Sequence, residues 1–553
     1  MSLSRAVARG TTQLLGGLLA AKAMDFALYL VLARRLGVEE FGRYMFAFSF
    51  TLLFNIVADV GLSTVFTREA SRAPERIRVL LGDTLVLKLA LGAITIAATA
   101  AVSIATGAPA RTILLVGLFT LAMLMNSSSL LFEGLLKSAG RAGIAGLSLV
   151  AQSATALAVG LALVLGGAGA LGGACAYAAA AFVHVAAAAF ASRGLWRADR
   201  ARATVRGNTS ARNTTSARST TSARGTVASR GTMPASRTAP APGTARASRT
   251  AAASRVPGSA WARRLALLRE SAPLAISGVF IALYFRVDSV MLHAIQGERA
   301  VGLYGGIYRF FEGFVLLSAA YRSVLFPVMA RAADGPREAL GVLCRKSLRL
   351  HLIFTVGVAT FFSFEARPII TLVLGEAYAA AAPGLTVLIW ALPGAYMADT
   401  LLHLLTAQRR QSDGARVAVV VALFNLGLNA VLIPRFSFVG ASAATVASEA
   451  LCFVLLFAAF RRGVPAVGLA RTAWRPLAAG AVLAGVLALA LPRLPGGPAA
   501  LPLAGAVALG AYATALALLK AFGREDWEVA LALLPARLRR RPAATPPRPA
   551  SSP

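Results

Sequence analysis

The sequence predicts an all-α polytopic membrane protein with about fourteen transmembrane helices: two six-helix lobes related as a parallel repeat, then two further helices. Its composition is 57% hydrophobic and 14% charged, whereas soluble chains are about 45–50% apolar and about 25% charged. Apolar runs long enough to cross a bilayer core of roughly 30 Å recur along the whole chain. A loop pattern in the first half also recurs at the equivalent place in the second half.

The hydropathy pattern places the spans in order. Long apolar runs predict helices, because in lipid the backbone polar groups must be satisfied within the segment. We expect spans at residues 10–33, 41–66, 79–106, 112–136, 143–166, 169–191, 272–295, 300–327, 347–373, 384–407, 415–434, 438–460, 475–491 and 500–521.

The distribution of basic residues predicts the orientation. If the N-terminus lies inside, Lys and Arg gather in inside segments such as 331–349 and are sparse in the outside loops. Cytoplasmic loops carry such an excess. We therefore expect both termini to lie in the cytoplasm.

Residues 193–264 interrupt the membrane pattern. They are rich in Arg, Ser, Thr and Ala and poor in large apolar residues, so we expect them to be disordered. The expected domains are an N-terminal lobe at 1–192, this cytoplasmic linker at 193–264, a C-terminal lobe at 265–462, two extra spans at 463–523 and a basic, Pro-rich tail at 524–553.

The linker either simply joins the two halves or binds anionic lipid of the inner leaflet, at roughly 1 kcal/mol per basic residue near the surface. The net charge of +33 would suggest nucleic acid in a soluble protein. No aromatic residues alternate with the linker arginines, so nucleic-acid binding is disfavoured.

A repeated loop relates the two halves. Gly37, Gly42 and Tyr44 form a G-x4-G-x-Y pattern between the first two spans, and the same pattern starts at Gly297, between the seventh and eighth. Six spans precede the linker, so both halves begin with the same orientation. We interpret this as a parallel repeat, in which substrate sites lie near the midplane between repeats. Two unrelated glycine turns are the alternative.

Charged residues inside the spans indicate a hydrated interior, because a charge at a helix centre costs about 2.5–3.5 kcal/mol on insertion scales. Lys22 with Asp25, and Arg309 with Glu312, are i,i+3 pairs that share a helix face and can neutralise each other. Arg322 lies near the inner end of its span, where its side chain can reach water.

Lys88 and Arg286 are the best candidates for contacting an anion, because both are deep and neither has a partner three or four residues away. Arg grips phosphate bidentately, whereas Lys acts as a point charge. Asp288 cannot share a face with Arg286, so it needs a partner across the lobe interface or binds a coupling cation. Asp59 and the isolated Glu449 are further candidates for ion coupling or charge pairing.

Several chemical motifs are missing from the sequence. It contains no Walker A motif, no HExxH, no GxSxG and no Cys/His cluster. The outside loops are short, which disfavours a membrane-embedded glycan polymerase. We expect no enzyme activity, catalytic residue, metal or cofactor.

Two stretches resemble a known family. Both are similar to polysaccharide-unit (Wzx-type) flippases. The first stretch consists of ARRLGVEEFGRYMFAFSF (33–50) followed by DVGLSTVFTRE (59–69), and the second is FRVDSVMLHAIQGERAVGLYGGIYRF (285–310). This oligosaccharide flippase family belongs to the superfamily that also holds lipid II flippases and multidrug and toxin extrusion (MATE) antiporters. The resemblance implies two lobes around a cavity with alternating access, in a bacterial plasma membrane.

The implied substrate is an undecaprenyl-pyrophosphate-linked oligosaccharide, moved from the inner to the outer leaflet for polysaccharide export. Polysaccharide-assembly proteins are possible partners, and the last two spans would add a groove for the lipid tail. The pyrophosphate of such a substrate would need basic groups, and the candidates for substrate contact among the charged residues of the spans are Arg286, Lys88, Lys22, Arg309 and Arg322. A MATE-like cation or drug antiporter is the alternative, with an acid-dominated cavity and twelve spans.

Overall fold

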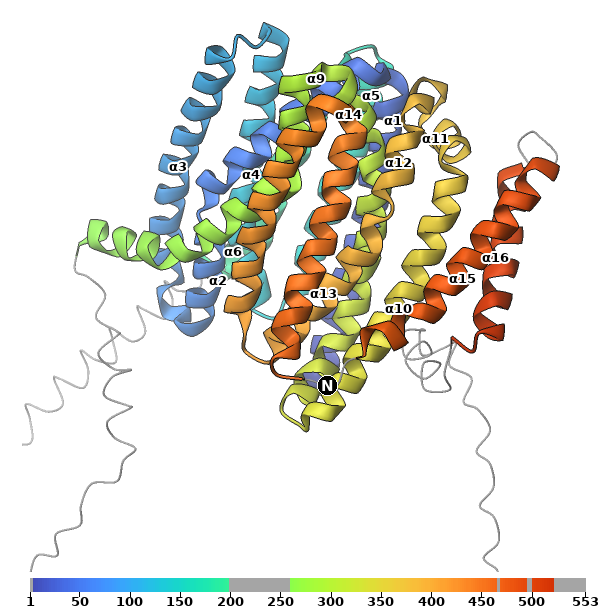
Figure 1. Ribbon diagram of the computed structural model, residues 1–553. Coiled ribbons are helices and arrows are strands. Elements are labelled where there is room, and N and C mark those ends of the chain that lie inside the picture. Colours follow the sequence, from blue (N-terminus) through green and yellow to red (C-terminus); the bar gives the residue numbers. More distant parts are fainter. Residues whose placement is uncertain (1–2, 198–258, 465–467, 495–499, 522–553) are drawn as a thin grey trace, which may run out of the picture.

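The computed structural model describes residues 3–197, 259–464, 468–494 and 500–521, and these residues form helices and turns without any β-strand (Figure 1). The first half contains α1 (Leu3–Asp59), α2 (Leu62–Arg72), α3 (Ile77–Ala105), α4 (Ala110–Ser138), α5 (Ala142–Leu165) and α6 (Gly169–Arg197). The second half contains α9 (Ala260–Ala333), α10 (Arg337–Phe364), α11 (Ala366–Leu374), α12 (Ala382–Leu388), α13 (Ala391–Ala407), α14 (Gln411–Arg461), α15 (Leu469–Ala490) and α16 (Ala500–Leu518).

The membrane-spanning character follows from helix length and apolarity. Ten helices among the described residues can cross a membrane, or eleven if the bent pair α12–α13 counts as one span. The chain is therefore a multi-pass membrane protein. Fourteen spans stay a prediction, because α1, α9 and α14 are each long helices that bend and are counted once.

The bends in α1 and α9 lie at the two repeated glycines. Gly37 has φ 74° and ψ 173°, and Gly297 has φ 80° and ψ −175°. This positive-φ conformation is open to glycine and strained for residues with a side chain. The same backbone break at both repeat positions is what a duplicated helix pair predicts.

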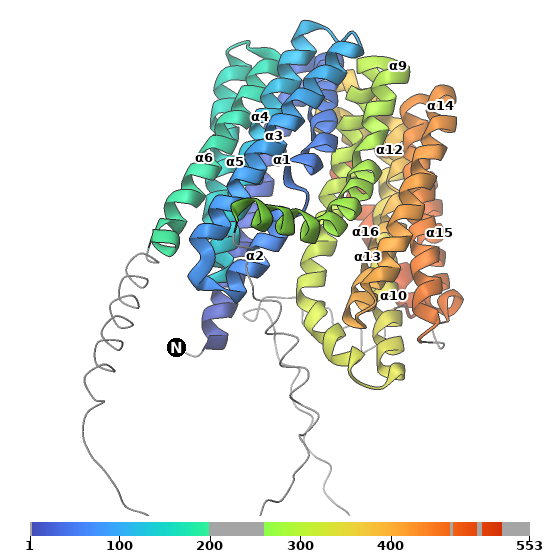
Figure 2. The ribbon, with the colours of Figure 1, turned by 90° about the vertical axis from the view of Figure 1, so that its left-hand side faces the viewer.

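The two halves form two lobes that lie side by side (Figure 2). The N-terminal lobe holds α1 and α3 to α6, and the C-terminal lobe holds α9, α10 and α12 to α14. α15 packs on α10, and α16 packs on α15, at the side of the C-terminal lobe (Figure 1). We call the end at which α1 and α10 begin the inner end, following the predicted orientation, and the opposite end the outer end.

Several expected boundaries differ from the structure. The span expected at 41–66 ends at Asp59, because Val60 and Gly61 take positive φ before the separate helix α2. The span expected at 384–407 is broken between α12 and α13, with a bend of 46°.

Both margins of the expected linker are helical. α6 continues to Arg197, and α9 begins at Ala260, where the Ser259 hydroxyl accepts a hydrogen bond from the Ala262 amide at 3.2 Å. The rest of the linker, like the expected basic tail at 524–553, lies outside the described residues.

The start of α9 lies against the N-terminal lobe rather than its own lobe (Figure 2). Leu267 packs in one buried cluster with Leu62 and Leu87. Asp83 accepts hydrogen bonds from Arg263 at 2.7 Å and Arg264 at 3.1 Å. This first stretch of α9 therefore ties the second half to the inner end of the first.

Candidate functional site

Two arginines from α9 share one carboxylate beside the lobe interface. Arg286 Nη2 lies 3.0 Å from Glu312 Oε1, and Arg309 Nη1 lies 2.6 Å from Glu312 Oε2. We call Arg286, Arg309 and Glu312 the interface cluster. One carboxylate cannot neutralise two guanidinium groups, so the cluster keeps a net positive charge.

The interface cluster faces aromatic rings of the other lobe. The Arg286 guanidinium carbon lies 5.6 Å from the Phe48 ring centroid, and that of Arg309 lies 4.7 Å from the Tyr29 ring centroid. A cation over an aromatic face within about 6 Å is attracted by the ring quadrupole. Both rings belong to α1, so the cluster lies where the two lobes meet.

Each arginine of the interface cluster also retains an unused donor. The Nε atoms of Arg286 and Arg309 are buried and have no hydrogen-bond partner among the described residues. A buried donor without a partner costs about 1–3 kcal/mol. An anion that accepts from these groups would remove that penalty, so the arrangement is suited to binding an anionic ligand.

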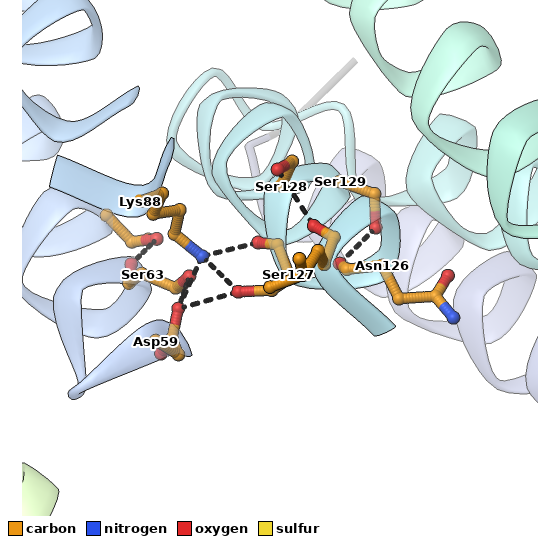
Figure 3. A network of polar contacts seen from close by, with 9 residues as sticks. Asp59, Ser63, Lys88, Asn126, Ser127, Ser128 and Ser129 are labelled. Atoms are coloured by element: carbon orange, nitrogen blue, oxygen red, sulfur yellow. Dashed lines mark hydrogen bonds and ion pairs between the residues drawn. The ribbon is translucent and has the colours of Figure 1, made fainter. Parts of the chain in front are cut away.

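Lys88 lies in a separate, closed network inside the N-terminal lobe (Figure 3). Its Nζ lies 2.5 Å from Asp59 Oδ1, 2.5 Å from the Ser127 carbonyl oxygen and 2.6 Å from Ser127 Oγ. Ser63 Oγ also donates to Asp59 at 2.6 Å. The side chain of Lys88 is 3% exposed.

The expectation that Lys88 and Arg286 lack partners is wrong. Lys88 pairs with Asp59 of α1, and Arg286 pairs with Glu312, which lies on α9 beyond the bend at Gly297. A spacing of three or four residues reveals neither partner. A role for Lys88 in substrate contact stays a prediction. Such contact would require Lys88 to give up one of its three hydrogen bonds.

The remaining basic candidates lie apart from the interface cluster. Lys22 Nζ lies 3.2 Å from Asp25, and both side chains are more than one third exposed. Arg322 Nη1 lies 2.8 Å from Asp399 Oδ1, to which Ser318 also donates at 2.8 Å. The structure therefore brings together Arg286 and Arg309, but not Lys22, Lys88 or Arg322.

Asp288 is buried within the C-terminal lobe. Its Oδ2 accepts from the Tyr304 hydroxyl at 2.6 Å, and its Oδ1 accepts from the Ser289 amide at 2.7 Å. Both partners belong to α9. The structure therefore does not show the partner for Asp288 that we expected across the lobe interface. Tyr304 also lies 3.3 Å from the Thr445 hydroxyl of α14.

Glu449 lines a cavity of about 230 Å³ inside the C-terminal lobe. Its Oε1 accepts from the Tyr284 hydroxyl at 2.6 Å, so it is not isolated. Arg322 and Asp399 line the same cavity, whose other walls are mostly apolar and aromatic.

Sequence reasoning missed one polar network in the N-terminal lobe. His184 Nε2 lies 2.9 Å from Glu133 Oε1, and Lys137 Nζ lies 2.7 Å from Glu133 Oε2. Asn126 Oδ1 lies 3.3 Å from His184 Nδ1. A lone histidine in the Ala-rich span at 169–191 was the available signal. Among the described residues, no group of His, Cys, Asp or Glu could hold a metal ion.

The sequence matches two protein families. The family described as "Polysaccharide biosynthesis protein" matches residues 7–228 and 260–333. The family described as "Lipid II flippase MurJ" matches residues 311–498. No curated protein matches the chain.

The fold is similar to solved structures of transporters. The lipid II flippase MurJ in an inward closed conformation has a TM-score of 0.66 and 11% identity, over 91% of this chain and 98% of that chain. An inward-facing multidrug resistance MATE family transporter of the MOP superfamily has a TM-score of 0.57 and 14% identity, over 81% and 95% respectively. These matches are to flippases and transporters rather than to enzymes.

Proposed function

Because the chain belongs to the polysaccharide biosynthesis protein family, we propose that it flips an undecaprenyl-pyrophosphate-linked oligosaccharide from the inner to the outer leaflet of the bacterial plasma membrane. The single observation that carries the proposal is the net positive interface cluster of Arg286, Arg309 and Glu312. Its position beside both lobes is where a transporter built from two repeats would bind its substrate.

The chemistry of the cluster fits a pyrophosphate. Guanidinium groups bind phosphate oxygens through two parallel hydrogen bonds, and such charge-assisted bonds are about twice as strong as neutral ones. The buried Nε donors of Arg286 and Arg309 are available for this purpose. Glu312 would hold the two side chains in place without cancelling both charges.

Alternating access is supported by the outer end, where the repeated loops pack against each other. A Cβ on Gly42 would lie 1.9 Å from the Glu298 carbonyl oxygen, and a Cβ on Gly302 would lie 1.9 Å from the Val38 carbonyl oxygen. These two contacts are reciprocal under the repeat. We take this contact as the closed outer gate, which would part when substrate is released outside.

Ion coupling would use buried carboxylates that no basic side chain neutralises. Asp288 and Glu449 fit this description, since their hydrogen-bond partners are tyrosine hydroxyls and a backbone amide. Asp59 is already paired with Lys88, and Asp25 with Lys22. Asp288 and Glu449 are therefore our candidates for binding a proton or a cation.

A MATE-like antiporter remains the second candidate because of the cavity that Glu449 lines. Aromatic residues form much of its wall, including Phe280, Tyr284 and Phe285. A carboxylate with aromatic faces is a setting that can bind an organic cation. The interface cluster, with its opposite charge, favours the flippase.

A transport assay separates the two functions. Purified wild-type protein in proteoliposomes is given a fluorescent undecaprenyl-pyrophosphate-linked oligosaccharide, and flipped lipid is scored with a membrane-impermeant quencher. A parallel assay measures uptake of an organic cation such as ethidium. We expect flipping above protein-free vesicles and no cation transport. Cation transport without flipping would support the antiporter and contradict our proposal.

A further inference from the structure

A group of uncharged polar side chains lies in the N-terminal lobe, beside the interface cluster. Gln152 Nε2 of α5 donates to Asn126 Oδ1 of α4 at 2.8 Å, and Asn126 Nδ2 donates to the Tyr177 hydroxyl of α6 at 3.4 Å. We call Asn126, Gln152 and Tyr177 the amide cluster. All three side chains are half-buried, so a ligand can reach them.

Aromatic contacts join the amide cluster to the interface cluster. The Arg286 guanidinium carbon lies 5.6 Å from the Phe48 ring centroid, and the Phe48 and Tyr177 ring centroids are 5.7 Å apart. Arg286 and Arg309 are close enough to Tyr177 to act electrostatically on its hydroxyl. A ligand held by the two arginines would therefore meet Phe48 and Tyr177 on its N-terminal side.

The space beside the amide cluster is hydrated. Lys22 and Asp25 belong to an expected span of α1, yet their side chains are 52% and 42% exposed. Charged side chains inside a membrane face protein or a water-filled cavity rather than lipid. Asp25 also acts electrostatically on Tyr177, so the ion pair and the amide cluster border the same hydrated space.

The amide cluster keeps unused hydrogen-bonding groups. Gln152 uses one amide hydrogen, and its Oε1 has no partner in the part of the chain that the structure describes. The Tyr177 hydroxyl accepts from Asn126, which leaves its own hydrogen available for donation. These groups carry no charge, and the Asp25 carboxylate disfavours a second anion here. A neutral ligand rich in hydroxyl groups fits better than another phosphate.

A buried network holds Asn126 in place from behind. His184 Nδ1 lies 3.3 Å from Asn126 Oδ1, and His184 Nε2 lies 2.9 Å from Glu133 Oε1. Figure 3 shows that the Asn126 side chain points away from Lys88. Side chains fixed by such surrounding contacts lose little freedom when a ligand binds. Asn126 is therefore a positioning residue for Gln152 and Tyr177.

We propose that the amide cluster, together with Phe48, binds the first sugar of the lipid-linked oligosaccharide and sets which sugar is accepted. This rests on the proposed function: the interface cluster takes the pyrophosphate, and the amide cluster takes the sugar bonded to it. A sugar offers hydroxyl groups to Gln152 and Tyr177 and an apolar C–H face to the aromatic rings. A site built to hydrogen-bond a substrate hydroxyl strongly rejects an analogue that lacks it.

Competition between two lipids tests the proposal. Purified full-length protein in detergent is mixed with equal amounts of undecaprenyl pyrophosphate and of the same lipid carrying glucose, galactose or N-acetylglucosamine. Native mass spectrometry gives the ratio of the two bound lipids. Both lipids are compared in one sample, so the ratio does not depend on the fraction of protein that is folded.

The variant is Q152M/Y177F, which removes the polar groups and keeps the size of the side chains. The matched control is Q296M/Y512F, which makes the same two changes in the second half of the chain. There Gln296 and Tyr512 donate to backbone carbonyls, away from both clusters.

We expect wild type to prefer at least one glycosylated lipid over undecaprenyl pyrophosphate. The double variant should lower this preference about 25-fold, and Q152M alone about 5-fold, as the loss of one neutral hydrogen bond predicts. The control should stay within about 2-fold of wild type, because distant sites act independently.

Binding of the sugar-free lipid separates this proposal from the proposed function. If wild type and the double variant bind undecaprenyl pyrophosphate equally but share one sugar preference, the sugar site is wrong and the pyrophosphate site stands. An equal loss in the control, or no preference in wild type, would also overturn the sugar site. Wild type that binds none of these lipids would contradict the proposed function itself.

Discussion

The two lobes are alike at the outer end and different in the interior. At the outer end, Gly42 and Gly302 each contact a backbone carbonyl of the opposite lobe, at positions related by the repeat. In the interior, the N-terminal lobe closes Lys88 with Asp59 inside its own core, whereas the C-terminal lobe turns Arg286 towards the interface. The two lobes are therefore alike in their backbone contacts at the outer end and differ in how their buried charged side chains are paired.

This difference separates charges that hold a lobe together from charges that can bind a ligand. Lys88 Nζ donates three hydrogen bonds, one to Asp59 and two to Ser127. Arg286 and Arg309 share Glu312 and keep unused Nε donors. We infer that saturation of hydrogen bonds, more than depth in the membrane, distinguishes the two roles.

The largest effect is expected from breaking the closed pair of the N-terminal lobe. Asp59→Asn leaves the buried Lys88 without a counter-charge, so the free energy of unfolding should fall by about 3 kcal/mol. Unfolding by sodium dodecyl sulfate in micelles measures the loss. The double variant Asp59→Asn/Lys88→Met should recover part of it. A single variant as stable as wild type would show that the pair is not structural.

An intermediate effect is expected from disturbing the two repeat-related backbone contacts at the outer end. Gly42→Ala and Gly302→Ala each place a Cβ against a backbone carbonyl of the other lobe. Overpacking costs about 1–3 kcal/mol, so each variant should shift the lobes towards an open outer end by a similar amount.

Labelling of a single cysteine near the outer loops by a membrane-impermeant maleimide measures this opening. Gly313→Ala is the control, because a Cβ there meets nothing within 4 Å. Unchanged labelling of both gate variants would mean that the loops do not form the gate.

The smallest effect is expected at the ion pair beside the gate. Arg43 binds Glu298 bidentately, with both N–O distances at 2.8 Å. The nearby pair of Arg299 with Glu39, whose positions correspond to each other in the repeat, is exposed and 3.8 Å apart. Arg43→Gln should shift the same labelling equilibrium by at most about 1 kcal/mol, and Arg299→Gln by less. A larger shift with Arg299→Gln would reverse this ranking.

The fold could be predicted from the sequence because membrane helices are defined locally. Apolar run length sets the spans, and the glycine pattern starting at Gly37 and Gly297 indicates the repeat. The breaks at Val60–Gly61 and between α12 and α13 escaped prediction, because packing against other helices determines where an apolar run bends.

The site could be predicted only where partners lie on one helix turn. Arg309 with Glu312 follows from i,i+3 spacing, and the structure shows that contact. Lys88 with Asp59, and Arg286 with Glu312, join different helices or distant turns, so no spacing rule finds them.

The central claim is that the interface cluster binds the anionic part of the substrate. Its most direct test is the initial flipping rate of a labelled lipid-linked oligosaccharide in proteoliposomes, for Arg286→Gln and Arg309→Gln against Arg367→Gln, an exposed arginine outside the cluster. Loss of a charge-assisted hydrogen bond, worth about 1.5–3 kcal/mol, predicts rates at least about 10-fold lower for the two cluster variants and a wild-type rate for the control. Wild-type flipping by both cluster variants would contradict the claim.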